Sequence, residues 1–145
     1  MRSSPKFFYI CRAIGLYYKP HNESSISVLK QLVDLHSSAP GLDDAVASAL
    51  RKIGTKDIVP VVAELLDSQD PQAQLRAASF FGFYSLFADA KGDVVQGNLV
   101  KGPFATADTR QYTPRSGSSL TPSQYASFWK TWWLQNSSRL GFAAQ

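Results

Sequence analysis

The residues that could perform chemistry in this chain are few and widely separated. Its two histidines, His21 and His36, have no carboxylate partner at metal-ligand spacing on the same predicted element. The single cysteine, Cys11, lies in an apolar run, as a small core residue would, and it cannot form an intrachain disulfide. Neither a nucleophile elbow nor a glycine-rich phosphate loop is present. We therefore predict no catalytic residue, no cofactor and no metal site.

The adjacent acidic residues Asp43 and Asp44 are the closest approach to a carboxylate pair. Side chains at neighbouring helical positions point to different faces, so the two carboxylates would not share a proton or a metal ion. A helix is predicted to begin at Leu42, and acidic side chains in a first turn interact favourably with the helix dipole. We therefore interpret the pair as structural.

All three tryptophans lie within residues 129–133, at helical spacing with Tyr125 and Phe128. Two interpretations are open. The cluster is either a buried cap over the end of a helical stack, or an aromatic patch that binds a partner through Trp129 and Trp133.

Composition places the chain among ordered proteins. With 145 residues, 44% hydrophobic and 18% charged, it suits one structural domain with a real core. The apolar run 7–11 is interrupted by Arg12, so it is shorter than the roughly seven residues that a signal peptide needs. No stretch approaches the roughly 18 apolar residues of a membrane span. We expect a cytoplasmic protein without membrane contact.

The net charge of +4 is unevenly distributed. Residues 1–22 contain four basic and no acidic residues, residues 23–90 contain five basic and nine acidic, and residues 91–145 contain six basic and two acidic. A repeat protein that binds nucleic acid needs positive charge along its repeats. The acidic central segment therefore argues against a nucleic-acid partner.

Local signals predict a series of helices. Their expected extents are Pro5–Tyr18, Ser24 or Ser25 to His36, Leu42–Ile53 ended by Gly54, a helix capped by Thr55 that contains Pro60, Pro71–Ala88 after the Asp70 cap, and a final helix with a Thr121/Gln124 capping box and Pro122 at its first position. Between Asp89 and Leu120 the helical period stops, which predicts an irregular connector with a small hairpin at 94–100 as one interpretation.

The apolar pattern of one predicted helix pair occurs twice in the sequence. The apolar pattern of residues 42–53 recurs thirty-one residues later at 73–84, and Val28, Leu29, Leu32 and Leu35 match positions thirty residues downstream. A repeat of this length is typical of stacked helical arrays. The helix at 71–88 is apolar on almost all sides, so we expect it to be buried on two sides and covered by a downstream segment.

The run 58–67, the turn Asp70-Pro71 and the run 77–82 together resemble a HEAT repeat, most closely the short bacterial variety also seen in phycobilisome-lyase-like proteins. The arginine common after the turn in that family is replaced by Asp43 and Gln74. The resemblance spans roughly residues 7–88. It implies an all-α protein, a short α-solenoid with repeats over 1–90, a connector over 91–120, and a tryptophan-rich capping helix and tail over 121–145.

HEAT-repeat proteins commonly bind other proteins, so the resemblance implies a non-catalytic interaction or scaffold module with an unknown protein partner. The second helix of each pair would line the binding face, and we expect Leu75 to be the exposed apolar residue there. The candidate partner-binding residues are Asp44, Ser48, Arg51, Leu75 and Ser79, with Gly82 at the end of the strip.

Two other functions stay open. One is a nucleic-acid-associated HEAT-like protein that uses its basic termini, with Arg110, Arg115, Lys130 and Arg139 near the tryptophans. A glycosylase of that kind would also need a catalytic carboxylate, and none is found. The other is a lyase or chaperone-like role, which follows from fold analogy alone. The oligomeric state is not predicted.

Overall fold

The computed structural model describes residues 23–34, 41–88 and 104–142, and in these ranges the protein is all-α with no residue in a β-strand. The helices are α2 (Glu23–Asp34), α3 (Leu42–Ile53), the short 3-10 helix η1 (Lys56–Ile58), α4 (Val59–Leu65), α5 (Pro71–Phe87), α6 (Ala107–Gln111) and α7 (Pro122–Asn136). The predicted helix at Pro5–Tyr18, the hairpin at 94–100, Cys11 and both histidines lie outside the described residues.

Helix α3 has the predicted boundaries, Leu42 and Ile53. It ends because Gly54 adopts a left-handed conformation, with φ of 67°, and donates its N–H to the carbonyl oxygen of Leu50 at 3.0 Å. Acidic residues occupy the first turn and basic residues the last, which matches the helix dipole at both ends.

The segment after Gly54 differs from its prediction. Thr55 precedes the first turn, but its side chain makes no capping hydrogen bond, and residues 56–58 form the 3-10 helix η1 before α4 begins. Pro60 is consequently the second residue of α4, where the missing N–H would have no helical partner in any case. Pro60 therefore removes no hydrogen bond from the interior of α4.

The caps of α5 and α7 form as predicted. Asp70 Oδ1 accepts a hydrogen bond from the Gln72 N–H at 3.0 Å, and Pro71 is the first residue of α5. Thr121 and Gln124 exchange reciprocal hydrogen bonds, with Gln124 Oε1 accepting the Thr121 N–H at 2.8 Å. These two helices begin where local side-chain chemistry satisfies their free N–H groups.

The connector was predicted to lack helix through Leu120, and this is wrong for residues 107–111, which form α6. Thr106 Oγ1 accepts the Thr109 N–H at 3.2 Å, and Thr109 Oγ1 accepts the Thr106 N–H at 2.8 Å. A threonine thus completes the box that usually needs a glutamate or glutamine. The buried side chain of Thr109 anchors this short helix.

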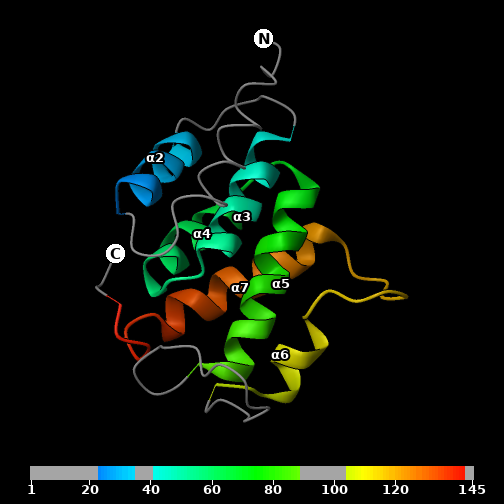
Figure 1. Cartoon of the computed structure of the whole chain (residues 1–145). Helices are drawn as coiled ribbons and strands as arrows, with labels where there is room; N and C mark the ends of the chain where they lie inside the picture. The colour runs from blue at the N-terminus through cyan, green and yellow to red at the C-terminus, as the bar shows by residue number, and fades with distance from the viewer. Residues whose placement is uncertain (1–22, 35–40, 89–103, 143–145) are drawn as a thin grey trace.

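The described helices α2, α3, α4 and α5 form two pairs in two layers (Figure 1). Within each pair, α2 packs against α3 and α4 packs against α5; between pairs, α2 lies beside α4 and α3 beside α5 (Figure 1). This arrangement buries most of the described apolar residues that recur at the offset of thirty to thirty-one residues, although Val28 of α2 is 41% exposed. On α3 the exposed residues are Arg51 and Lys52, and on α2 the exposed residues include Val28.

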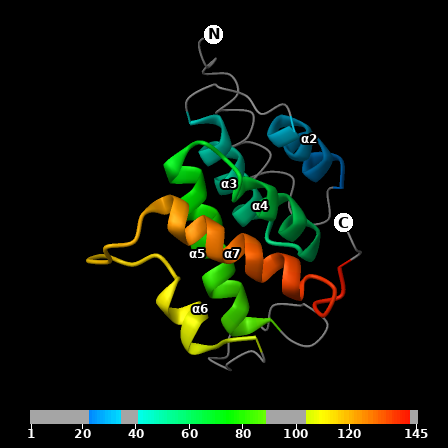
Figure 2. The same ribbon diagram turned by 180° about the vertical axis from the view of Figure 1, so that it is seen from behind.

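Helix α7 lies across α5 and makes the most extensive helix contact in the described structure (Figure 2). The ring of Phe81 on α5 lies 5.6–6.3 Å, centroid to centroid, from the rings of all three tryptophans. Phe81 and Trp129 have no exposed surface. The downstream segment that we expected to cover the helix at 71–88 is therefore α7.

Candidate functional site

The strip predicted to bind a partner comes from two neighbouring helices, α3 and α5. Arg51 is exposed, and Ser48 and Ser79 are half-buried. Asp44 is engaged within the protein, because its Oδ1 accepts a hydrogen bond from Arg76 Nε on α5. The helices therefore bring the two serines and Arg51 to one side of the molecule, while Asp44 joins the helices together.

Leu75 and Gly82, the other two residues predicted for this strip, are not accessible to a partner in the way that was expected. Leu75 is half-buried and packs against the core, so it is not the exposed apolar residue that was expected. A Cβ atom on Gly82 would lie 2.4 Å from Thr113 Oγ1, because the segment after α6 packs directly over this glycine. The accessible strip ends at Ser79.

The acidic pair at the start of α3 connects this helix to the segment that contains the α4–α5 turn and α5. Ser68 Oγ, in the turn between α4 and α5, donates a hydrogen bond to Asp43 Oδ2 at 2.5 Å and accepts one from the Asp70 N–H at 3.0 Å. Asp44 accepts its hydrogen bond from Arg76. The two carboxylates therefore bind different parts of the segment from Ser68 to Arg76, and both also lie in the first turn of α3, where the helix-dipole interaction was predicted.

Trp129 and Trp133 lie in the core. Trp129 has no exposed surface and Trp133 is 5% exposed. Trp129 Nε1 donates a hydrogen bond to the carbonyl oxygen of Tyr112 at 2.8 Å, and the ring of Trp133 lies 5.0 Å from that of Phe142. A partner would find almost no tryptophan surface at this site.

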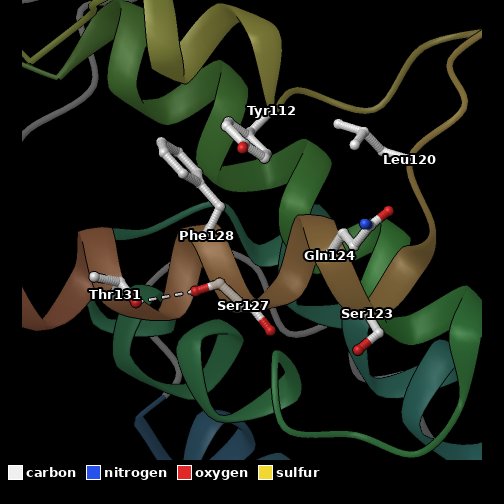
Figure 3. A pocket seen from close by; sticks show the side chains of 7 residues that line it. All are labelled: Tyr112, Leu120, Ser123, Gln124, Ser127, Phe128 and Thr131. Atoms are coloured by element: carbon white, nitrogen blue, oxygen red, sulfur yellow. Dashed lines mark hydrogen bonds between the residues drawn. The ribbon is translucent and has the colours of Figure 1, made fainter.

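The outer side of α7 carries a cavity of about 450 Å³ between that helix and the segment after α6 (Figure 3). Its lining residues are Tyr112, Leu120, Ser123, Gln124, Ser127, Phe128 and Thr131. Ser123, Ser127 and Thr131 follow one another along α7, and the Phe128 side chain extends from the same helix toward Tyr112, which lies on the segment after α6 (Figure 3).

A second cavity, of about 280 Å³, continues the first toward the end of α7. The two share Phe128 and Thr131, and the second is also lined by Phe104, Thr106, Asp108, Trp132, Gln135, Asn136 and Arg139. The Arg139 guanidinium lies 4.8 Å above the Phe104 ring. We name the two cavities together the α7 groove.

A further groove, of about 300 Å³, lies between α4 and α7. Its charged side chains are paired: Lys130 with Asp67, and Glu64 with Lys30 of α2 at 3.2 Å. Leu134, 70% exposed, is its apolar edge. These pairs connect the outer layer of helices without creating an unbalanced charge.

Within the three described ranges, no three His, Cys, Asp or Glu side chains come together as metal ligands would. None of the described helices is both long and apolar enough to cross a membrane. The grooves are lined by hydroxyl, amide, aromatic and aliphatic groups together with a few charged side chains.

Sequence reasoning missed the α7 groove. Two signals were present: the Thr106-x-x-Thr109 box that starts α6, and the four-residue spacing of Ser123, Ser127, Thr131 and Gln135 on one side of a helix. The contact between Tyr112 and Phe128 depends on how the segment after α6 packs against α7, and no local sequence pattern predicts it.

Comparison with known proteins provides no relative. No family model, no curated protein and no solved structure matches the chain.

Proposed function

We propose that the protein is a non-catalytic protein-interaction module of the HEAT-repeat type. In this proposal α2–α3 and α4–α5 are successive helix pairs of a short α-solenoid, and α7 is the cap that covers the apolar side of the last pair. A module of this kind acts by presenting a stable surface to another protein.

The observation that carries the proposal is the agreement between the sequence repeat and the packing. Residues thirty to thirty-one apart occupy matching places, since α2 lies beside α4 and α3 beside α5. Arg76 and Asp44 join the second helices of the two pairs. Stacking of like units on their neighbours is how repeat proteins build a continuous core.

A protein partner suits the charges better than a nucleic acid. The three described ranges contain nine basic and nine acidic residues, so the excess positive charge lies elsewhere in the sequence. Two cations near the tryptophans are also engaged: Lys130 pairs with Asp67, and Arg139 binds Asn136 and covers Phe104. Nucleic-acid binding requires cations that are free to contact phosphates.

The test begins with the full chain immobilised and exposed to an extract of the cells that make it. A retained protein is then purified, and its binding is measured by isothermal titration calorimetry. Arg51→Glu is compared with Lys52→Glu, the same charge change at the neighbouring exposed residue of α3. We expect one-to-one binding that Arg51→Glu weakens at least tenfold and Lys52→Glu does not.

Two results would contradict the proposal. If no purified protein binds the chain, the interaction function is wrong. If a partner binds but both charge reversals weaken it equally, the effect is general electrostatic attraction and the α3–α5 strip is not its binding surface.

A further inference from the structure

We propose that the α7 groove binds an extended peptide segment of the partner, about five or six residues long, mostly uncharged and with a basic residue at the α6 end. This inference rests on the proposed interaction function and adds the class of partner and the place where it binds. Four properties of the groove support it: length, hydrogen-bonding groups, a fixed apolar centre and one free charge.

The length suits a peptide in the extended conformation. From Ser123 to Gln135 the groove follows twelve steps of α7, which is about 18 Å at 1.5 Å per residue. An extended chain advances about 3.3 Å per residue, so five or six residues cover this distance. A single sugar ring would fill only part of it.

The α7 side of the groove offers a row of hydrogen-bonding groups. The hydroxyls of Ser123 and Ser127 and the amide of Gln135 make no side-chain hydrogen bond within the described structure. Gln124 uses its Oε1 for the cap of α7, which leaves its amide nitrogen as a donor. Hydroxyls and amides both donate and accept, so this row matches the alternating C=O and N–H groups of a peptide backbone.

The centre of the groove is apolar, and its two aromatic rings are fixed by contacts with the buried Trp129. The rings of Tyr112 and Phe128 stack with centroids 4.3 Å apart and planes within 6°. Trp129 supports both, because it meets the Phe128 ring edge-on at 5.0 Å and donates its Nε1–H to the Tyr112 carbonyl oxygen. Since one face of each ring already faces the other, the pair suits an aliphatic side chain or a proline better than a sugar platform.

Charge gives the peptide a direction. The part of the groove between Ser123 and Thr131 has no charged lining residue, whereas Asp108 and Arg139 line the other part. Arg139 donates to Asn136 Oδ1 at 2.9 Å and covers the Phe104 ring. Asp108 is exposed and makes no ion pair with any residue in the described ranges. A basic side chain of the peptide would pair with it.

The test is a selection of displayed random heptapeptides on the full chain, followed by calorimetry with the synthetic forms of the selected peptides. We expect enriched peptides to share an aliphatic residue or proline and, at one end, a lysine or arginine. Ser127→Trp should fill the groove and weaken binding at least tenfold, and Ser123→Trp gives the same blockade at a second exposed position. Ser138→Trp, in the groove between α4 and α7, is the matched control and should leave binding unchanged.

Asp108→Lys tests the direction. It should lower affinity for the basic peptides at least fivefold and shift a repeated selection toward acidic residues at the same end. All four variants should keep the helical circular dichroism and the thermal transition of the parent, since each site is exposed.

Three outcomes would overturn the inference: no peptide is enriched, the enriched peptides bind Ser127→Trp and Ser123→Trp as tightly as the parent, or maltohexaose binds while no peptide competes with it. A purified partner that is weakened by Arg51→Glu but not by Ser127→Trp would overturn the groove alone and leave the interaction function standing. Absence of any partner and of any enriched peptide would overturn both.

Discussion

Helices α3 and α5 carry the same apolar pattern thirty-one residues apart, and they are packed in different ways. Where α3 has Ala49, Leu50 and Ile53, α5 has Phe80, Phe81 and Tyr84. One side of α3 stays open, with Arg51 and Lys52 exposed, whereas α5 is contacted by α3 and α4 on one side and by α7 on the other.

The difference shows that the apolar pattern and the size of the side chains have separate effects on packing. The shared pattern determines which side of each helix faces the inner layer. Each buried aromatic residue removes about 150–250 Å² from water and favours ring contacts at 4.5–7 Å, and this gives α5 enough apolar surface for a second neighbour. The tryptophans of α7 supply that neighbour.

The largest expected effect comes from truncating the matched core residues Phe81 and Leu50, both fully buried. We expect Phe81→Ala to lower the free energy of unfolding by about 3–5 kcal/mol and Leu50→Ala by about 2–5 kcal/mol. Phe81→Ala should be the more severe because it removes the ring that all three tryptophans contact. Urea unfolding followed by far-ultraviolet circular dichroism measures both. A greater loss of stability for Leu50→Ala would contradict the comparison, because α5 would then not be the more extensively packed of the two helices.

A smaller effect is expected at Gly82, which aligns with the exposed Arg51 of α3. An alanine Cβ at position 82 would lie 2.4–2.9 Å from three side-chain atoms of Thr113. We expect Gly82→Ala to cost about 1–3 kcal/mol through overpacking, and Arg51→Ala to change stability by less than about 0.5 kcal/mol.

Thermal or urea unfolding of the double variant checks the cause. All the close contacts belong to the Thr113 side chain, so in a Thr113→Gly background the added methyl group should cost little or nothing. If Gly82→Ala is equally costly in both backgrounds, the close packing of Thr113 on α5 is not the reason.

The smallest effect is expected for the ion pair that joins the two copies. The side chains of Asp44 and Arg76 are 28% and 42% exposed, so their coupling should be about 0.2–1 kcal/mol and should decrease with added salt. A double-mutant cycle with Asp44→Ala and Arg76→Ala measures it. Lys130 and Asp67, 49% and 52% exposed, form the control pair and should couple more weakly. Equal coupling in both cycles would show that the inter-repeat pair has no special role.

Sequence predicted the helices whose ends are set by their own residues. Gly54 ends α3, Asp70 with Pro71 starts α5, and the Thr121/Gln124 box starts α7. Each signal acts over three or four residues, so the chain reveals it without knowledge of the fold.

The features that sequence did not predict depend on distant neighbours. Leu75 lies where a second-helix pattern predicts an exposed residue, yet it packs against the core, and Gly82 is covered by Thr113. Of the strip, Arg51 is exposed and Ser48 and Ser79 are half-buried, and its role in binding stays a prediction. The α7 groove was missed because Tyr112 and Phe128, sixteen positions apart, meet only after the connector has folded back.

The gathering of all three tryptophans on α7 gives the protein a built-in optical reporter for one helix. Their indole rings are buried against Phe81, so the folded protein should emit at the shorter wavelengths of an apolar environment. Emission will shift to the red when α7 leaves α5, even while the helices from α2 to α5 persist. The fluorescence spectrum therefore follows the detachment of a single segment, and ellipticity follows the helices as a whole.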